Sequence, residues 1–168
     1  AVIAKPSTHI LLTHPHRDVS PGCAALVAAT GAKVLGMSPL ASDPSQDRDT
    51  AIDQTLIDGE LFEALGWPLQ VIHTPGHVEN HLCFHAPEDG WLITGDHLIQ
   101  GSTVVIIPPH GRLGDYLASL RKLLPYLWSY RWRVGLALGF LLLAKVANVS
   151  VPVLLKHLVD ALDLKPGD

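Results

Sequence analysis

Four polar clusters, each placed after a short apolar run, constrain the fold of this chain most strongly. The first contains His14, His16 and Asp18, and the next two centre on His77 in HTPGHVENH and Asp96 in TGDH. The fourth is the segment GSTVVIIPPHG. Short apolar runs bounded by turn residues are typical of buried strands. Strands that alternate with helices and end in polar side chains predict α/β layers with the chemistry at the strand ends.

The pattern between these clusters predicts the order of the elements. One helix is expected to begin with Ser20 as its N-cap and to stop at Gly31, because small polar residues start helices and glycine ends them. The polar segment 38–54 is expected to be a long surface loop bordering an active site. Strands are expected at 9–14, 33–37, 69–76, 81–87 and 90–96, and an amphipathic helix at 114–124.

The residue types in the clusters predict a metal site. His14, His16 and Asp18 alternate, so in an extended chain all three side chains point the same way. Imidazole and carboxylate groups suit Zn²⁺ and related divalent ions. Glycine precedes both His77 and Asp96 and permits the sharp turns that aim these side chains inward. A single histidine before a turn is usually a surface or capping residue, but several ordered clusters favour ligands that converge on one point.

Composition sets weaker limits. The 168 residues suit one domain with an appendage, and a net charge of −4 gives no reason to expect a nucleic-acid partner. Ten histidines against one methionine direct attention to metal or proton chemistry. Cys23 and Cys83 are too few for a disulfide framework and indicate a reducing compartment. The chain starts with Ala-Val-Ile and no signal peptide, so we expect it to be a fragment.

The motifs THPHRDVSPG, TPGHVENHLCF and LITGDH resemble the metallo-β-lactamase superfamily, whose signature is HxHxDH followed by a later His and Asp. The downstream GSTVVIIPPHGRLGDYLASL is similar to the branch of metallo-hydrolases and β-lactamase-like endoribonucleases. The resemblance covers about residues 1–124. It implies part of an αββα sandwich, and hydrolysis of an ester, thioester, phosphodiester or related bond by metal-bound hydroxide.

The resemblance also implies roles for individual residues. His14, His16 and His77 correspond to the ligands of the first metal ion, with Asp96 bridging. Asp18 corresponds to the carboxylate of the second metal site that also orients the attacking water, so Asp18 and Asp96 are the expected catalytic residues.

Two departures from the family pattern affect the second metal site. Val19 stands where the family has a histidine ligand, and the family's last histidine ligand has no counterpart before the chain changes character. The second site would keep only Asp18 and Asp96. We therefore expect one tightly bound zinc ion rather than two, and hydrolysis that is impaired or absent.

The other histidines are expected to have supporting roles. His97 is expected to lie behind the metal ligands. His81 is expected beside His77 only if the turn that joins these two residues is helical. His110 is expected on a surface loop. The histidines expected to cap or pack are His9, His73 and His85.

From Leu120 onward the composition becomes rich in Leu, Val and Ala. This shift predicts a hydrolase domain over 1–119, a basic and aromatic junction over 120–133 and a transmembrane helix within 134–168. Segment 134–155 has 22 residues and one charge, Lys145, which is long enough to cross a bilayer. A buried helix of a soluble domain is the alternative, but it would normally show a polar stripe. The flanking basic and aromatic residues are Arg121, Lys122, Arg131, Arg133, Trp128, Tyr130 and Trp132.

Basic residues before the helix place the N-terminal domain in the cytoplasm by the positive-inside rule. The stretch LLPYLWSYRWRVGLALGFLLLAKVANVSVPVLLKHLVDAL resembles the first membrane helix of ABC exporters of the heavy-metal and glutathione-conjugate type. No GxxxxGK[ST] motif is present, so no ATP site is expected. We expect the two families to be joined near 120–124, as a fusion or fragment.

Three functions follow from these patterns. The first is a metal-dependent hydrolase acting on a small-molecule or RNA-like substrate and held at a membrane through 134–155; without insertion the chain would be cytoplasmic. The second is a non-catalytic fragment of a membrane exporter. The third is a module that binds one metal ion without turnover.

Overall fold

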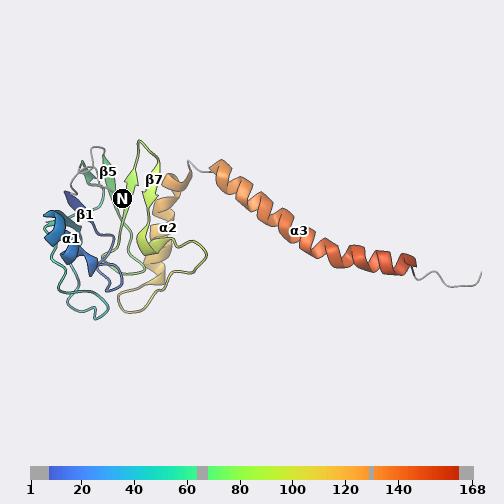
Figure 1. Cartoon of the computed structure of the whole chain (residues 1–168), viewed down its shortest axis with the longest axis horizontal. Helices are drawn as coiled ribbons and strands as arrows, with labels where there is room; N and C mark the ends of the chain where they lie inside the picture. Colours follow the sequence, from blue (N-terminus) through green and yellow to red (C-terminus); the bar gives the residue numbers. More distant parts are fainter. Residues whose placement is uncertain (1–7, 64–67, 129–130, 163–168) are drawn as a thin grey trace, which may run out of the picture. The chain divides into compact units, whose positions relative to one another are not determined.

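The computed structural model of the chain describes residues 8–63, 68–128 and 131–162 (Figure 1). The chain divides into two compact units, Ala1–Tyr126 and Leu127–Asp168. The first unit contains two small β-sheets and two helices, and the second contains one long helix. In chain order the elements are β1 (His9–Leu11), α1 (Gly22–Thr30), β2 (Lys33–Gly36), β3 (Gln54–Thr55), β4 (Leu61–Phe62), β5 (Leu69–His73), β6 (Leu82–Ala86), β7 (Trp91–Ile93), the 3₁₀ turn η1 (Gly95–His97), α2 (Leu113–Leu127) and α3 (Arg131–Leu162).

The two sheets differ in strand direction. The first has the order β1-β2-β3 and all its pairs are parallel. The second has the order β4-β5-β6-β7 and all its pairs are antiparallel. The predicted hairpin is formed by β6 and β7, and Gly90, with φ +71°, closes it through a hydrogen bond from its N–H to the Ala86 carbonyl. The strands β3 and β4 were not predicted, because two residues are too few to show a periodic pattern.

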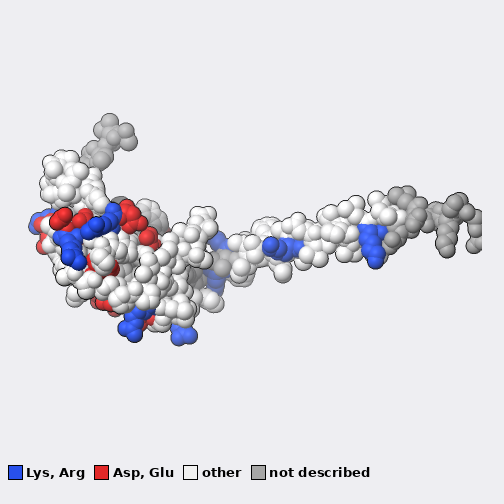
Figure 2. Space-filling view, turned by 90° about the horizontal axis from the view of Figure 1, so that it is seen from below, with Lys and Arg blue, Asp and Glu red and all other residues white. Residues whose placement is uncertain are grey.

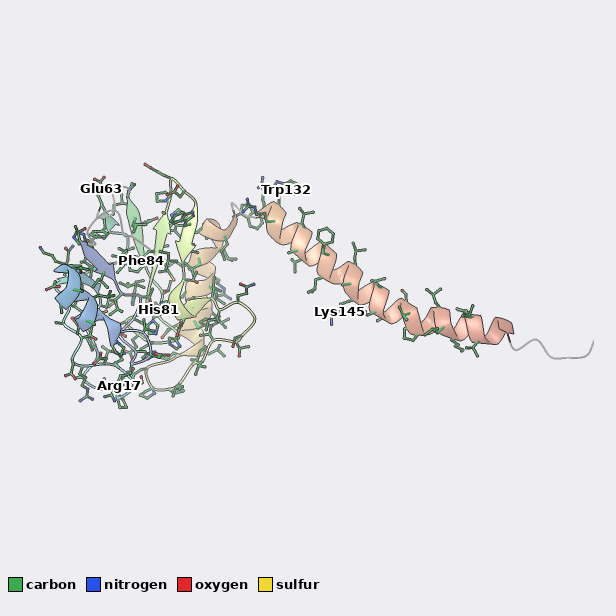
Figure 3. The ribbon with its side chains drawn as sticks, viewed as in Figure 1. Arg17, Glu63, His81, Phe84, Trp132 and Lys145 are labelled. Atoms are coloured by element: carbon green, nitrogen blue, oxygen red, sulfur yellow. The ribbon has the colours of Figure 1, made fainter. Side chains whose placement is uncertain are left out.

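Buried side chains that alternate between the two faces of each sheet form three separate apolar cores. Leu35, Val71 and Phe84 are buried together between the two sheets. Figure 3 shows Phe84 in the interior of the first unit. Val34, the neighbour of Leu35, packs with Cys23 of α1, on the other face of the first sheet. On the outer face of the second sheet, Ile72 and Cys83 pack with Leu123 of α2. Because successive strand residues face opposite ways, each sheet has one face toward the other sheet and one toward a helix. The layers are therefore α1, sheet, sheet, α2, which confirms the predicted αββα arrangement.

Helix α1 starts differently from the prediction. Its N-cap position is Pro21 rather than Ser20, and no side chain caps it. The Ser20 hydroxyl donates instead to the His16 carbonyl at 3.0 Å and to the Asp47 carboxylate at 3.3 Å, so it is engaged by the loops. The predicted stop is confirmed: Gly31 has φ +70°, and its N–H donates to the Val27 carbonyl.

Helix α2 places the end of the first unit later than the sequence predicted. The boundary expected at residue 119 falls inside this helix, which continues to Leu127. The composition changes before the helix ends because α2 needs apolar residues on its buried face. Leu123 is fully buried against the sheet, and the Ser119 hydroxyl donates to the Pro75 carbonyl at 2.7 Å. Helix α2 therefore supports the loop that follows β5.

The second unit consists of α3, a continuous helix that includes the predicted segment 134–155. Residues Arg131–Val159 form a 29-residue stretch that is long and apolar enough to cross a membrane; its most apolar 18-residue window has a mean hydropathy of 2.0, and none of that window is buried. Figure 2 shows a largely uncharged surface along this helix with isolated basic residues. The helix bends in its second half (Figure 1), the half that contains Pro152. Tyr130, one of the aromatic residues of the predicted junction, lies outside the described residues.

The packing of α2 gives a direct test of the unit boundary. Leu123→Ala should lower the free energy of unfolding by about 2–5 kcal/mol, because it leaves a cavity against Ile72 and Cys83. Leu124→Ala is the matched control: Leu124 is 55 % exposed and its loss should cost less than about 0.5 kcal/mol. Urea unfolding of both variants measures the difference. Equal effects would show that α2 does not belong to the sandwich.

Candidate metal centre

Loops from both sheets meet at one edge of the sandwich. His14 and His16 follow β1, His77 lies between β5 and β6, and Asp96 lies in η1 after β7. The Leu82 N–H donates to the Thr13 carbonyl at 2.7 Å and joins the segment after β1 to the start of β6. This backbone hydrogen bond places the first ligand loop beside the second.

Two glycines shape these loops, as the sequence predicted. Gly76 has φ +147°, and a Cβ there would lie 2.4 Å from the Cα of Tyr116 in α2. Gly95 has φ +48°, and a Cβ there would lie 2.8 Å from Nε2 of His81. Both positions therefore need glycine for backbone conformation and for space. Each turn delivers the following residue, His77 or Asp96, to the site.

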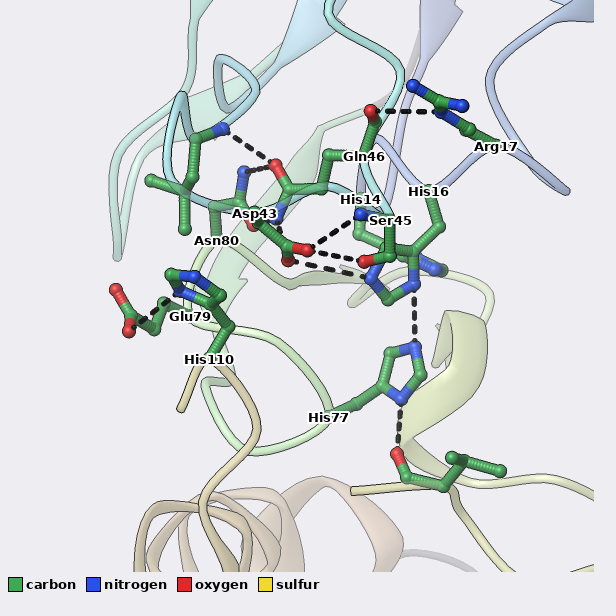
Figure 4. A network of polar contacts seen from close by, with 12 residues as sticks. His14, His16, Arg17, Asp43, Ser45, Gln46, His77, Glu79, Asn80 and His110 are labelled. Carbon is green, nitrogen blue, oxygen red and sulfur yellow. Dashed lines mark hydrogen bonds and ion pairs between the residues drawn. The ribbon is translucent and has the colours of Figure 1, made fainter. Parts of the chain in front are cut away.

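The three predicted histidine ligands converge. The donor nitrogens of His14, His16 and His77 all lie within 4.8 Å of one another, and His77 Nε2 is 3.0 Å from His16 Nδ1 (Figure 4). Asp96 Oδ2 lies 3.6 Å from His14 Nε2 and 3.7 Å from His77 Nε2. The four side chains are therefore close enough to share one ion with modest adjustment.

The donor set fits a divalent metal ion. His14 Nε2 is buried and has no hydrogen-bond partner in the described part of the chain, which is costly unless something else occupies its lone pair. Three imidazole nitrogens plus a carboxylate match the ligands that Zn²⁺ and related ions take. Burial, followed by the nearby His16 and His77, lowers the pKa of His14 to about 3. Burial, then His77, also lowers the pKa of His16. Both imidazoles are therefore ready as neutral ligands at neutral pH.

The second nitrogen of each ligand histidine faces an oxygen atom. His77 Nδ1–H donates to the Val105 carbonyl at 2.6 Å, which leaves Nε2 free to bind a metal. His14 Nδ1 is 3.1 Å from the Thr13 hydroxyl, and His16 Nε2 is 4.0 Å from Oδ2 of Asp43. Oxygen partners of this kind fix the tautomer and the ring orientation of metal-binding histidines.

Asp43 belongs to a buried network that the sequence did not reveal. Segment 38–54 is largely loop, as predicted, but Asp43 and Gln46 within it are 4 % and 0 % exposed. The amide of Gln46 donates to Asp43 Oδ2 and to Asn80 Oδ1, each at 2.9 Å (Figure 4). Burial raises the pKa of Asp43, but hydrogen bonds from Ser45 and Gln46 outweigh it and hold that pKa below its usual value. Nothing in the polar run 38–54 distinguishes these two residues from solvent-exposed ones.

Asp18 lies at the mouth of the site, and the neighbouring Val19 lies outside the pocket lining. Asp18 is exposed and lines the same pocket as Asp96, outside the compact group of three histidine nitrogens. Its expected role as a second-site ligand that orients water stays a prediction. Val19 is 40 % exposed, and its N–H donates to the His16 carbonyl at 3.0 Å. An isopropyl side chain at this position offers no donor atom.

His81 and His97 lie behind the ligands. Both are fully buried, and their rings extend from His14 toward α2: the centroid distances are 5.1 Å from His14 to His81 and 5.6 Å from His81 to His97. His97 then contacts the ring of Tyr116 at 4.7 Å. His97 therefore lies behind the ligands, separated from His14 by His81. His81 reaches this place without the helical turn that the sequence analysis required.

The remaining histidines are held by local contacts. His73 Nε2–H donates to the Glu79 carbonyl at 2.8 Å, and the ring of His85 packs on Tyr126. His9 packs edge-on against Phe62. These contacts agree with the predicted capping and packing roles. His110 differs from its prediction: its side chain is only 15 % exposed, pairs with Glu79 at 3.4 Å and lines the pocket of the metal centre.

A pocket of about 560 Å³ opens over the ligands. Its polar side includes His16, His77, Asp96 and Asp18. The apolar side is formed by Val105, Ile107, Pro108 and Pro109. A larger hollow of about 930 Å³ lies beside α1, but its lining includes none of the three ligand histidines. We therefore place the chemistry in the smaller pocket.

Comparison with known proteins agrees with this geometry. Residues 1–127 match the metallo-beta-lactamase superfamily. A hydroxyacylglutathione hydrolase of Rhizobium meliloti (strain 1021) is 40 % identical over 91 residues, which cover 54 % of this chain and 34 % of the relative. An atrochrysone carboxyl ACP thioesterase of Claviceps purpurea (strain 20.1) is 30 % identical over 118 residues, 70 % of this chain and 34 % of the relative. The crystal structure of TTHA1623 in a di-iron-bound form superposes with a TM-score of 0.57 at 30 % identity, covering 70 % of this chain and 63 % of that chain.

These comparisons also set limits. The chain spans about a third of the length of the two curated relatives. The di-iron neighbour shows that the fold alone does not fix which metal is bound. The superfamily match ends at residue 127, so the resemblance of the following segment to ABC exporters stays a prediction.

Buried neutral histidines should make the metal-free chain sensitive to acid. Burial, followed by the nearby His77, lowers the pKa of His97 to about 4 in the folded chain, against the ordinary 6.5. Between these values the unfolded chain binds one proton more, so the free energy of unfolding falls as the pH falls. For His97 alone the loss should be about 2 kcal/mol between pH 7.5 and pH 5.

Urea unfolding with a chelator, at both pH values, measures this loss. His97→Phe should lose about 2 kcal/mol less than the parent chain over this interval, since a phenyl ring cannot be protonated. The comparison at pH 7.5 isolates the effect of the substitution on packing. Parallel pH dependence in the two proteins would show that His97 is not held neutral.

The contact between Asp43 and His16 should affect metal retention. Asp43→Asn removes the charge that faces His16 Nε2, and it should weaken zinc affinity by about 10- to 100-fold, as loss of such a partner typically does. The matched control is Asp49→Asn, which alters an exposed carboxylate of the same loop. Chelator competition gives both dissociation constants. Equal affinities would rule out a role for Asp43 in positioning His16.

Proposed function

The chain belongs to the metallo-beta-lactamase superfamily, and on that premise we propose that it is a zinc-dependent hydrolase of acyl esters or thioesters. The observation that carries the proposal is the convergence of His14, His16 and His77, with Asp96 beside them, at the base of an open pocket. The names of two relatives support the acyl substrate class, since one is a thioesterase and the other a hydroxyacylglutathione hydrolase.

The ligand residues and their neighbours have different roles in the proposed reaction. His14 Nε2, His16 Nδ1, His77 Nε2 and a carboxylate oxygen of Asp96 would hold the ion. A bound zinc ion lowers the pKa of its water from about 15.7 to near 7 and polarises an adjacent carbonyl. The Val105 carbonyl keeps the proton of His77 on Nδ1, so that Nε2 stays available. Asp18, exposed at the mouth of the same pocket, can accept a proton from an attacking water.

We further propose that one ion is held tightly and that turnover is slow. A second ion would depend on Asp18 and Asp96, because Val19 cannot coordinate. Ligand type and number govern how well a site retains a metal, so two carboxylates without an imidazole form a weak site. A single ion can both activate water and polarise the substrate, and hydrolysis by one ion remains chemically sound.

Zinc content and thioester hydrolysis test this function together. The purified chain should hold about one zinc ion, and His77→Ala should lose it, because the number and type of ligands govern how well a site retains a metal. Val19→His should raise zinc content toward two ions and increase hydrolysis of an acetyl thioester less than it increases metal occupancy. Inductively coupled plasma mass spectrometry and a thiol-release assay give the two readouts.

The outcomes separate the three functions considered from the sequence. One zinc ion without hydrolysis would indicate a metal-binding module. Absence of metal would leave a non-catalytic fragment. Two tightly held ions with rapid hydrolysis in the unaltered chain would show that Val19 does not weaken the second site.

We also propose that α3 anchors the hydrolase unit to a membrane. The support is its exposed apolar surface: side chains such as Leu138, Phe140 and Leu142 are 61–68 % exposed over a length sufficient to span a bilayer. Arg131 and Arg133 begin the helix on the side of the hydrolase unit, which the positive-inside rule places in the cytoplasm. Exposed Trp128 and Trp132 have the amphipathic character that suits a membrane interface.

Lys145 gives a test of this anchor because it lies near the middle of the apolar stretch. A lysine at the centre of a membrane helix costs about 2.5–3.5 kcal/mol, so Lys145→Leu should favour insertion by on the order of 100-fold. A glycosylation reporter placed after residue 168 measures the inserted fraction. The control lacks residues 131–162 and should be released from membranes by alkaline carbonate. Release of the complete chain under the same conditions would contradict the anchor.

A further inference from the structure

We propose that the segment 104–111 is an acyl-binding wall, and that the substrate is a thioester or ester with a neutral, apolar acyl chain. This inference rests on the proposed hydrolase function and names its substrate class. The proposal is based on two exposed aliphatic side chains, Val105 and Ile107, that line the same pocket as His77 and Asp96.

The wall is fixed beside the metal ligands by backbone contacts. The Val105 carbonyl accepts from His77 Nδ1–H at 2.6 Å. The Gly111 N–H donates to the Ile107 carbonyl at 2.7 Å, and the Arg112 N–H donates to the Gly76 carbonyl at 2.9 Å. A Cβ at Gly111 would lie 2.5 Å from the Ile107 nitrogen and 2.8 Å from the His77 carbonyl oxygen, so the segment packs tightly onto the ligand loop. The position of the wall and the position of His77 are therefore coupled.

The exposure of this segment identifies what it could bind. Val105 is 58 % exposed and Ile107 is 67 % exposed, and Pro108 and Pro109 extend the same apolar lining. A substrate whose carbonyl lies at the three histidines has its acyl chain within the pocket, next to these side chains. Covering them with an alkyl or aryl group removes apolar surface of both partners from water, which favours binding.

The charges of the pocket favour a neutral chain over an anionic one. Its lining includes the carboxylates of Asp18, Asp43 and Asp96 and one guanidinium, that of Arg17. A divalent ion held at the site would balance the two remaining negative charges, so the loaded pocket has no surplus positive charge for an anionic chain. Arg17 Nε already donates to the Gln46 carbonyl at 3.3 Å. A phosphodiester or nucleic-acid substrate is typically bound by several cationic side chains. The described lining lacks such a cluster, so the pocket suits an acyl chain better than an RNA backbone.

The experiment compares zinc-loaded complete chain on thioesters of one thiol, N-acetylcysteamine, that differ only in the acyl group. From acetyl through butanoyl and hexanoyl to octanoyl, kcat/KM should rise by up to about fourfold per added methylene, the limit for full burial. Succinyl, of the same length as butanoyl but anionic, should be at least about tenfold slower, since the loaded pocket has no unpaired cation to compensate the desolvation of its carboxylate.

Two variants test whether Ile107 causes the dependence of kcat/KM on acyl chain length. Ile107→Asn should flatten the chain-length dependence, while Ile57→Asn should preserve it, because Ile57 is equally exposed, at 66 %, but lies outside the pocket lining. A binding readout that needs no turnover uses thioethers, in which the carbonyl is replaced by a methylene. In saturation-transfer NMR on the metal-free chain, the S-octyl thioether should bind more tightly than the S-butyl one, and only Ile107→Asn should remove that difference.

The outcomes distinguish the wall from the hydrolase function. Thioester hydrolysis that is independent of chain length, or fastest on succinyl thioester or on bis(p-nitrophenyl) phosphate, would overturn the wall and leave a hydrolase. Thioether binding that depends on length and on Ile107, without hydrolysis of any thioester, would support the wall and refute the hydrolase. Absence of both would overturn both.

Discussion

The structure depends on two small sheets that pack face to face and are joined at one edge by a hydrogen bond from the Leu82 N–H to the Thr13 carbonyl. The loop that follows β1 of the parallel sheet carries His14 and His16. The loop between β5 and β6 of the antiparallel sheet carries His77. Neither sheet alone contains a metal site. Burial of Leu35, Val71 and Phe84 between the sheets stabilises the arrangement that brings these loops together.

Around this junction, the chain keeps its histidines neutral and oriented. Burial is the largest cause of the lowered pKa of His14, His16 and His97. Neutral imidazoles satisfy the first requirement of a metal site, and an oxygen atom facing the second nitrogen satisfies the next. The Val105 carbonyl serves His77 in this way, and the same segment provides the apolar side of the pocket. In the function that we propose, metal binding and substrate selection would therefore depend on the same segment of backbone.

Local patterns in the sequence, namely short apolar runs followed by glycine turns and donor side chains, predicted α/β layers and the convergence of the three histidines. The αββα order and the assignment of these histidines to one ion came from the resemblance to the metallo-β-lactamase superfamily. The sequence did not predict the burial of Asp43 and Gln46, since Gln46 is held by Asn80, 34 residues away in the sequence, and Asp43 is bonded to Gln46 in turn. His110 was expected on a surface loop for the same reason, because its contact with Glu79 depends on the folded loops. The domain boundary fell too early because an amphipathic helix against a sheet is rich in leucine, as a membrane segment is.

We infer that three imidazoles from two sheets hold one zinc ion. X-ray absorption spectroscopy at the zinc edge of the purified chain tests it most directly, because multiple scattering from imidazole rings reports the number of histidine ligands. We expect three imidazole nitrogens at about 2.0–2.1 Å from the zinc ion, together with an oxygen shell from Asp96 and solvent. A zinc environment of oxygen alone, or one that is unchanged when His77 is replaced by alanine, would contradict it.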